Sequence, residues 1–247
     1  MVSVTEIWRH PIKSHGRESL EAVALTAGKT MPWDRVWAVA HELSKADGTQ
    51  WEPCVNFSVG AKAPALMAIN ARVDEAAGTI TLRHPTRPDL TIDPDSEGAA
   101  LIEWVRPLMP VDRAASARVL RVPGRGMTDT DYPSVSLGNI ASHAELEDAM
   151  GQPLSKQRWR CNFWLEGVAP WDEFNWIGKS LRIGEAEVTV RERVKRCLAT
   201  TTNPETGIRD ADTLNTLNAD YGHQDFCVYA EVTKSGRVAS GDRAEVI

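Results

Sequence analysis

Apolar and polar residues alternate over many short stretches of the chain, which is the pattern of β-strands with one buried face. Between these stretches lie turns rich in glycine, proline, asparagine and aspartate. Strands are predicted over residues 2–8, 22–25, 35–41, 66–73, 79–83, 118–122, 158–165, 180–183, 187–194, 226–234 and 244–247. Many short strands and few helices predict a mainly β fold of the α+β class with a barrel-like body.

Three short helices are predicted between the strands. Ser96 is expected to cap a helix that extends through Val105. Ser142 opens a capping box, Ser-His-Ala-Glu, for a helix over residues 143–150. A third helix is expected over residues 212–217. Helices this short are typical of elements that cover a β-sheet body rather than form a bundle of their own.

The chain is predicted to have two parts joined by an irregular segment. Residues 110–133 are rich in proline, glycine, arginine and aspartate, which favours a connection over regular structure. We therefore predict an N-terminal β-rich domain over residues 1–115 and a second, barrel-like domain over residues 116–247. Residues 51–64, with two prolines and a glycine, are expected to form a long loop.

Charge and cysteine spacing restrict the class of protein. The 247 residues carry a formal net charge of −6, which argues against nucleic-acid binding because such domains normally present a basic face. The cysteines, Cys54, Cys161, Cys197 and Cys227, are too widely spaced for a zinc site or an evident disulfide framework. No apolar run approaches the roughly 18 residues of a membrane span, and no signal peptide is evident. We expect a cytoplasmic protein without a membrane anchor.

The segment over residues 188–207, VTVRERVKRCLATTTNPETG, contains the strongest candidate for chemistry. Its strand pattern breaks near Arg193 and leads to Cys197, with cationic side chains close by. Nearby cations stabilise a thiolate, which is the form of cysteine that attacks electrophiles and binds metals. The alternative is that Cys197 is a small buried apolar residue, since cysteine is among the most buried residue types.

Basic residues also gather at predicted strand ends elsewhere in this acidic chain. Lys13 and Ser14 follow the first strand, in a loop that can bind an anion or can simply be solvated. Arg35 stands at the start of a later strand, either as part of the same site or in a surface pair with the preceding aspartate. Arg160 and Asn162 are predicted to share one strand face with Arg158, suited to a phosphate or carboxylate. An exposed charged sheet face is the alternative.

These motifs resemble the MOSC superfamily, which includes the C-terminal domain of molybdenum-cofactor sulfurase and the mitochondrial amidoxime-reducing component. The most specific match is RCLATTTNPETG, beginning at Arg196, where the family pattern has Arg-Cys, two apolar residues, Thr-Thr, Asp-Pro and Thr-Gly. The segment over residues 159–162, WRCN, resembles the family's aromatic-Arg-x-Asn segment. The first half, from WRHPIKS to WDRVWAV, resembles the MOSC N-terminal β-barrel domain, and the rest resembles the MOSC domain.

The resemblance implies a binding site for the molybdenum cofactor, molybdopterin. It assigns Cys197 as the thiolate ligand of the metal and as the catalytic residue. A soft sulfur ligand suits a metal that is already bound by the dithiolene of the pterin. Residues assigned to hold the cofactor are Lys13, Ser14, Arg35, Arg160, Asn162, Arg196 and Thr201. Lys13, Ser14 and Arg35 match segments that hold the pterin phosphate, and Arg160 and Asn162 match a segment that holds the cofactor.

Three positions depart from the family pattern. His15 replaces a frequent cysteine, and Asn203 replaces the usual aspartate. Residues 49–52, TQWE, replace a Thr-Ala-Arg-Gln-like segment of the amidoxime reducers. Because this last difference lies in the long loop expected to shape the pocket, it leaves the substrate open.

The resemblance leads to a hypothesis about function. The protein is expected to be a molybdenum-dependent oxidoreductase that reduces N-hydroxylated compounds, such as amidoximes and hydroxylamines, to the nitrogen base and water. Electrons are expected from a separate ferredoxin or flavin reductase, because the sequence has no flavin or iron–sulfur motif. One alternative is a carrier of molybdenum cofactor, or of persulfide sulfur on Cys197, and another is a protein that keeps the motif but binds no metal. No sulfurase domain is evident, so pyridoxal phosphate is not expected.

Overall fold

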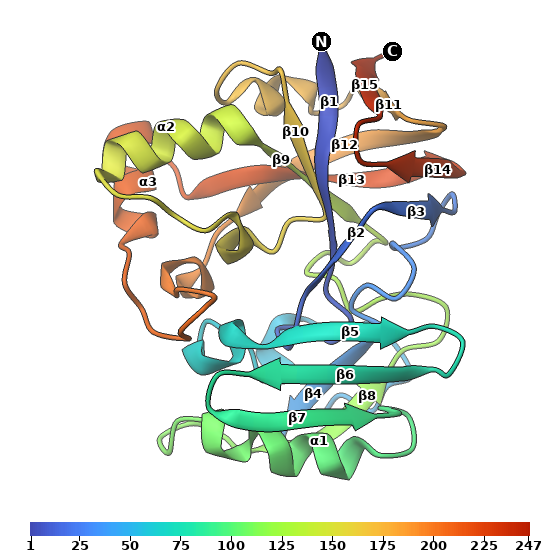
Figure 1. Ribbon diagram of the computed structural model, residues 1–247, viewed down its shortest axis with the longest axis vertical. Helices are drawn as coiled ribbons and strands as arrows, with labels where there is room; N and C mark the ends of the chain where they lie inside the picture. The colour runs from blue at the N-terminus through green and yellow to red at the C-terminus, as the bar shows by residue number, and fades with distance from the viewer.

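Seven strands of the protein close into a barrel, and a second lobe lies beside it (Figure 1). This computed structural model describes residues 1–247. The strands are β1 (Val2–Arg9), β2 (Glu18–Leu20), β3 (Ala22–Leu25), β4 (Trp37–His41), β5 (Asn70–Asp74), β6 (Thr79–His84), β7 (Arg87–Ile92), β8 (Ser116–Arg121), β9 (Val135–Asn139), β10 (Phe163–Glu166), β11 (Ser180–Ile183), β12 (Ala186–Lys195), β13 (Asp225–Lys234), β14 (Gly236–Ala239) and β15 (Arg243–Val246).

Helices are short and few. The α-helices are α1 (Gly98–Val105), α2 (Ile140–Met150) and α3 (Thr213–Tyr221). The 3-10 turns are η1 (Cys54–Asn56), η2 (Pro64–Ala68), η3 (Arg106–Leu108), η4 (Lys156–Trp159), η5 (Asp172–Trp176) and η6 (Leu198–Thr201). None of the helices combines the length and the apolar character needed to cross a membrane. The expectation of a mainly β, α+β protein with a barrel is confirmed.

The barrel follows from strands whose alternate residues are apolar. Its order is β10-β9-β13-β12-β11-β15-β1, and β1 pairs with β10, which closes the ring and leaves no free edge. Val188 and Val190 of β12 and Val228 of β13 point into the barrel core and are fully buried. Helices α2 and α3 lie together at one side of the barrel (Figure 1).

The second lobe has a separate apolar core. The sheet β5-β6-β7, the pair β4-β8 and helix α1 enclose it. Its buried residues include Trp37 of β4, Ile80 and Leu82 of β6, and Leu101 and Val105 of α1. Two cores of this kind explain why the lobes are distinct in Figure 1.

The chain begins in the barrel and then crosses to the second lobe. β1 is a barrel strand, and β3 pairs antiparallel with β14, so these two strands pack with the C-terminal half of the chain, while Ile12 between them belongs to the core of the second lobe. The predicted division between residues 115 and 116 stays a prediction. The structure adds that the first strands of the sequence complete the barrel that the last strands form.

The predicted starts of two helices were wrong, because the serine expected to cap each helix donates its hydroxyl to a carboxylate instead. Helix α2 begins at Ile140, and its cap is Asn139, whose Oδ1 accepts a hydrogen bond from the backbone N–H of Ala141 at 2.9 Å. Ser142 instead donates to the buried carboxylate of Glu173 at 2.8 Å. The predicted ends at Met150 and the following glycine, and the helix after residue 212, are confirmed.

The first helix shows the same kind of competition. Ser96 donates its hydroxyl to Asp93 Oδ2 at 2.7 Å and does not cap α1, which follows Glu97 without a side-chain cap. The predicted strand over residues 66–73 was also wrong at its start, because Pro64 opens the turn η2 and the strand β5 begins only at Asn70. Strand β7 was not predicted, since its sequence, RPDLTI, lacks a continuous apolar alternation.

The predicted strand over residues 158–165 is mostly not a strand. Lys156–Trp159 form the turn η4, Arg160 has a left-handed backbone with φ of 49°, and β10 contains only Phe163–Glu166. Arg158, Arg160 and Asn162 therefore do not share one strand face. The turn sends the three side chains in different directions, and this decides their roles.

Candidate functional site

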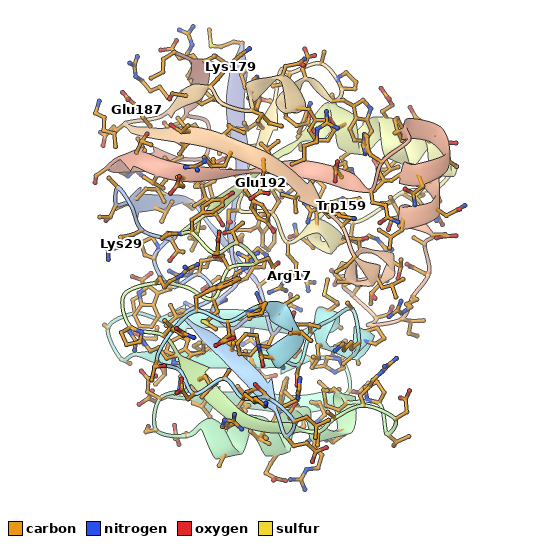
Figure 2. The ribbon with its side chains drawn as sticks, turned by 180° about the vertical axis from the view of Figure 1, so that it is seen from behind. Arg17, Lys29, Trp159, Lys179, Glu187 and Glu192 are labelled. Atoms are coloured by element: carbon orange, nitrogen blue, oxygen red, sulfur yellow. The ribbon has the colours of Figure 1, made fainter.

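The cavity that brings the predicted residues together lies between the two lobes. It has a volume of about 400 Å³. Its walls include Lys13, Ser14, Arg35, Cys54, Val55, Lys62, Asp129, Ser136, Arg158, Trp159, Arg160, Lys195, Arg196, Cys197, Thr200 and Tyr229. Figure 2 shows Trp159 and Arg17 at this junction of the lobes. Seven of these wall residues are cationic, which concentrates positive charge in a chain of net negative charge.

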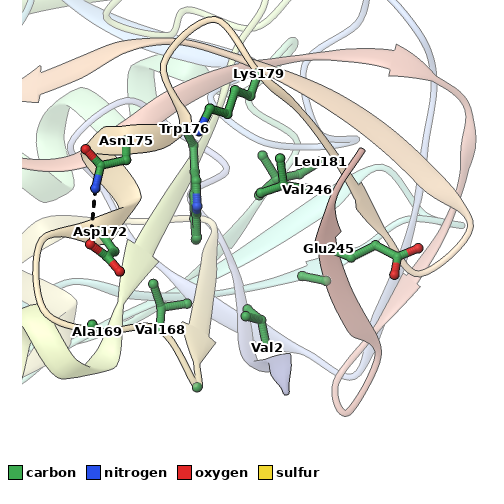
Figure 3. A pocket seen from close by; sticks show the side chains of 12 residues that line it. Val2, Val168, Ala169, Asp172, Asn175, Trp176, Lys179, Leu181, Glu245 and Val246 are labelled. Carbon is green, nitrogen blue, oxygen red and sulfur yellow. Dashed lines mark hydrogen bonds between the residues drawn. The ribbon is translucent and has the colours of Figure 1, made fainter.

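Two other cavities lack this chemistry. One, of about 360 Å³, lies by the chain termini and is lined by Val2, Trp176, Leu181 and Val246, with a single lysine, Lys179 (Figure 3). The other, of about 570 Å³, lies beside helix α2 and contains neither a cysteine nor an arginine. The cavity between the lobes is therefore the best candidate for a functional site.

Strand β12 delivers Cys197 to this cavity. The pairing of β12 with β13 shifts register between Val190 and Glu192 and again between Arg193 and Lys195, where the sequence pattern breaks. Two residues later, Cys197 precedes the turn η6 and is exposed. The alternative that Cys197 is a buried apolar residue is therefore wrong.

Lys13 forms the floor of the cavity together with an aspartate that sequence reasoning did not select. Its buried ammonium group donates to Met127 O at 2.8 Å and pairs with the carboxylate of Asp129. Desolvation by the surrounding wall opposes the charge on Asp129, but Lys13 and Arg35 outweigh it and lower the pKa of that carboxyl to about 2. Ser14 follows on the wall, with a positive φ of 61°.

Arg35 is held at the cavity by a buried network. Asp34, which is fully buried, pairs with Arg35 and accepts a hydrogen bond from the backbone N–H of His10 at 2.7 Å. Burial opposes the charge on Asp34, but Arg35 and His10 outweigh it, so the pKa of this carboxyl lies well below its usual range. Burial, then Arg160 and Arg35, lower the pKa of His10 to about 3, which keeps this imidazole neutral.

Arg160 lies next to the same group and is under electrostatic strain. Its guanidinium donates to Gly16 O at 3.1 Å, and its carbonyl accepts from Arg35 at 2.9 Å. Burial, followed by the positive charges of Arg35 and Arg17, lowers the pKa of Arg160 to about 9. A bound anion would relieve this repulsion, since opposite charge stabilises the protonated form.

A second group of arginines carries donors without partners. Arg196 donates to Phe226 O and to Trp159 O, each at 2.8 Å, while its Nη2 has no partner. Arg158 pairs with Asp210 at 2.5 Å, and its Nε and Nη1 have no partner although the side chain is buried. Unpaired buried donors cost free energy, so this wall is better satisfied with an acceptor present.

Two predicted residues do not line the cavity. Asn162 accepts at Oδ1 from the N–H and the hydroxyl of Ser136, both at 3.1 Å, and donates to Trp8 O at 3.1 Å. Thr201 is buried and donates to Leu198 O at 2.8 Å, while Thr200 lines the wall instead. Asn162 thus positions Ser136, which does reach the cavity.

Sequence reasoning missed several wall residues. Asp129 lies outside any helix or strand and Cys54 begins the short turn η1, so no periodic pattern selects either side chain. Partial burial, then the negative charges of Asp129 and Cys197, raise the pKa of the Cys54 thiol. Tyr229 interrupts the apolar strand β13, and this was the one sign in the sequence that its side chain faces something other than the core. Burial and the charge of Asp129 raise the pKa of Tyr229 well above its usual value.

The fold and the cavity define a two-lobed, barrel-containing protein with a cation-lined site around an accessible thiol. Comparison with protein families gives this class a name. The MOSC N-terminal beta barrel domain matches residues 1–106, and the MOSC domain matches residues 129–245. The chain belongs to the MOSC family. Domains of this family are associated with binding of the molybdenum cofactor.

Solved structures that match the chain include the YuaD protein from Bacillus subtilis, with a TM-score of 0.44 and 12% identity over 100% of this chain and 96% of that chain. YiiM from Geobacillus stearothermophilus matches with a TM-score of 0.34 and 14% identity, and YiiM from Escherichia coli with 0.34 and 17%. Both YiiM matches cover 46% of this chain and 53% of the other, so this chain spans about half of their length. A search of curated proteins found no match.

Proposed function

We propose that the protein binds the molybdenum cofactor in the cavity between its lobes and reduces N-hydroxylated compounds to the nitrogen base and water. The observation that carries this proposal is an exposed thiol, Cys197, on the wall of a cavity lined by seven cationic residues. A soft sulfur ligand and a cationic surround are the two features that a metal on a phosphorylated pterin requires.

The residues present fit this group. No set of three or more His, Cys, Asp or Glu side chains is placed to hold a metal ion, so a metal here needs most of its ligands from the molecule that brings it. Molybdopterin would bring a dithiolene, and Cys197 would add one thiolate. The unpaired donors on Arg158 and Arg196 are available for anionic or carbonyl oxygens of the same molecule.

The side chains divide the work of binding and orientation. Lys13, Arg35 and Arg160 would neutralise the phosphate, and Arg196, over the Trp159 ring, would support the neighbouring part of the ligand. The bound cofactor would supply two-electron redox chemistry at molybdenum.

Three further residues position or keep protonated the groups that face the cavity. Asn162 holds Ser136 in place through two hydrogen bonds at 3.1 Å. Tyr229 stays protonated because burial raises its pKa, so its hydroxyl remains a hydrogen-bond donor toward a substrate oxygen. The backbone N–H and the ring Nδ1 of His10 contact Asp34 Oδ1 at 2.7 and 3.3 Å, which leaves the other carboxylate oxygen to Arg35.

Reduction of an N-hydroxyl group to the amine and water consumes two electrons and two protons, and we propose a separate ferredoxin or flavin reductase as the donor. The rim of the cavity supports this. Val55 and Leu198 are 61% and 49% exposed beside the site. Lys62 and Lys195 line the same cavity, and neither forms an ion pair within 4.0 Å. An apolar and cationic rim suits an acidic protein partner.

Molybdenum and pterin content tests the proposal directly. The wild-type chain and Cys197→Ser, made in a cofactor-producing host, are assayed for both and for reduction of an aryl amidoxime by a reduced viologen dye. We expect near-stoichiometric metal and turnover in the wild type and loss of turnover in Cys197→Ser, with Cys54→Ser, the other exposed thiol, retaining metal. Turnover that survives in Cys197→Ala would contradict the assignment.

The exposure of Cys197 favours a second function, that of a carrier, because carried sulfur or cofactor must be accessible to an acceptor protein. A carrier releases its cargo to an acceptor protein, whereas an enzyme keeps it through many turnovers. Transfer of pterin or of persulfide sulfur to an apo molybdoenzyme, without steady-state amidoxime reduction, would favour the carrier.

A further inference from the structure

Only two of the four cysteines are exposed, and both line the cavity between the lobes. Cys54 lies in the long loop that precedes η2, and Cys197 follows β12 in the barrel. The other two, Cys161 and Cys227, are at most 1% exposed and pack in an apolar cluster with Trp159 and Phe226. The accessible thiols are thus paired across one cavity although 143 positions apart, the difference between residue numbers 54 and 197.

The loops that carry the two thiols pack against each other. A β-carbon built on Gly60 would lie 3.6 Å from the β-carbon of Ala199, two residues after Cys197. Arg209 donates to Ala61 O at 2.7 Å and so ties the end of the cysteine loop to the same segment. The negative charge of a Cys197 thiolate also contributes to raising the pKa of Cys54, which places the two sulfurs within electrostatic range.

We propose that Cys54 is the resolving thiol of Cys197, and that the pair is a site of reversible oxidation by low-molecular-weight disulfides such as oxidised glutathione. The Cys197 thiolate attacks the disulfide, forms a mixed disulfide and releases one thiolate. Cys54, after losing its proton to solvent, then attacks the Cys197 sulfur, which forms the Cys54–Cys197 bond and releases the second thiolate. Two protein thiols are oxidised, and one disulfide is reduced to two thiols.

The second attack sets a limit on the distance between the two backbones. A disulfide needs the two Cα atoms within about 7 Å of each other. Cys54 begins the three-residue turn η1 within an otherwise irregular loop, so this side can approach without breaking a β-sheet. The barrel side is more constrained, because Cys197 stands two residues after the long strand β12 and directly before the turn η6.

The cross-link would tie the two lobes together and remove Cys197 from any role as a ligand or nucleophile. This inference goes beyond the proposed function and does not depend on it, since exchange between thiols and disulfides needs no cofactor. If the protein does bind molybdenum, the cross-link would protect the cofactor-free site and a thiol reductant would reopen it.

Mass spectrometry of the full cofactor-free chain after treatment with oxidised glutathione tests the proposal. The intact wild-type protein should lose two hydrogens and retain no glutathione, and a non-reduced peptide map should contain a Cys54–Cys197 cross-linked peptide. Cys54→Ser and Cys197→Ser should each retain one glutathione and form no cross-link. Peptides of Cys161 and Cys227 from the same digest are the buried controls and should stay reduced.

Either of two outcomes would overturn the proposal. One is a wild-type protein that carries glutathione on Cys54 and Cys197 together. The other is a cross-link that involves Cys161 or Cys227. A thermal melt of both serine variants, together with circular dichroism, confirms that each is folded, which is expected because both positions are exposed. Molybdenum content is measured separately, so failure of this inference is distinct from failure of the cofactor proposal.

Discussion

Two groups of cations on one cavity differ in how the protein holds them. Lys13 and Arg35, the acid-held cations, are each paired with a carboxylate, Asp129 and Asp34 respectively. Their positive charge is fixed in place before any ligand arrives. Such preorganisation reduces the free energy that a ligand must supply to order the site.

Arg158 and Arg196, the open arginines, keep N–H donors without partners in a buried wall. Arg158 has one acid, Asp210, for three donor nitrogens, and Arg196 uses two backbone carbonyls. The acid-held cations therefore contribute to folding as well as to binding. The open arginines lower the stability of the ligand-free protein, and a ligand that accepts their hydrogen bonds would restore it. Variants that separate stability from binding test this difference.

The largest effect is expected from Asp34→Ala. This change leaves Arg35 and the backbone N–H of His10 buried without their partner. Removing one member of a buried ion pair costs about 3–5 kcal/mol. Urea unfolding of the purified protein measures the loss, with Asp34→Asn as a second variant that keeps the side-chain size and one acceptor oxygen but loses the charge and the other acceptor. A loss below about 1 kcal/mol would show that Arg35 finds another acceptor.

Arg158→Met is expected to act in the opposite direction. The variant removes two buried donors without partners, each of which costs about 1–3 kcal/mol, and keeps most of the side-chain volume. It also breaks the ion pair with Asp210, but that carboxylate is 40% exposed and keeps its hydrogen bond from Asn203, so the loss is expected to be small. The free energy of unfolding should stay equal or rise, while pterin content falls. A clear fall in stability would mean that these donors have partners in solution and would erase the distinction between the two groups.

Acid should weaken the acid-held side of the cavity. The folded-state pKa of His10 is lowered from 6.5 to about 3, so neutral His10 contributes stability that is complete above pH 6.5 and is lost as the pH falls toward 3. The slope from this group is at most about 1.4 kcal/mol per pH unit. His10→Gln should flatten that part of the profile of unfolding free energy against pH, and an unchanged profile would contradict the role of His10.

The smallest effect is expected at the rim. The double variant Lys62→Glu with Lys195→Glu should slow association with an acidic electron donor, such as a plant-type ferredoxin, by about tenfold at low salt. Lys29→Glu with Lys179→Glu, which changes the net charge equally on other parts of the surface (Figure 2), is the matched control. Stopped-flow traces at rising ionic strength should converge for the two proteins if the rim acts through charge.

Much of the barrel could be predicted, because β-strands with one buried face carry their signal locally. The strands around Val188 and Val228 follow the alternation, and even the break near Arg193 appears as register shifts in β12. The segment around Arg160 could not be predicted in this way. A turn, a left-handed residue and a short strand occupy a stretch whose residue types also suit one continuous strand.

Hydrogen bonds between residues far apart in the chain set a second limit on what can be predicted from the sequence. Ser142 satisfies the local rule for a helix cap, yet its hydroxyl donates to the buried carboxylate of Glu173, 31 positions away in the chain. Asn162 matches a cofactor-binding segment, yet it bonds to Ser136 and to the carbonyl of Trp8 and does not line the cavity itself. A polar side chain goes to the strongest partner within reach, and reach depends on the folded chain.

Residue periodicity and a contiguous motif are enough to predict from sequence that the protein is mainly β, that Cys197 is the strongest candidate for chemistry, and that the chain resembles the MOSC family. Three features came only from the folded chain: Asp129 pairs with Lys13, Arg158 and Arg196 keep unpaired donors, and Cys54 shares a cavity with Cys197. The physical reason is that burial, electrostatic pairing and thiol proximity arise between residues far apart in the chain, and no local pattern encodes the distance between them.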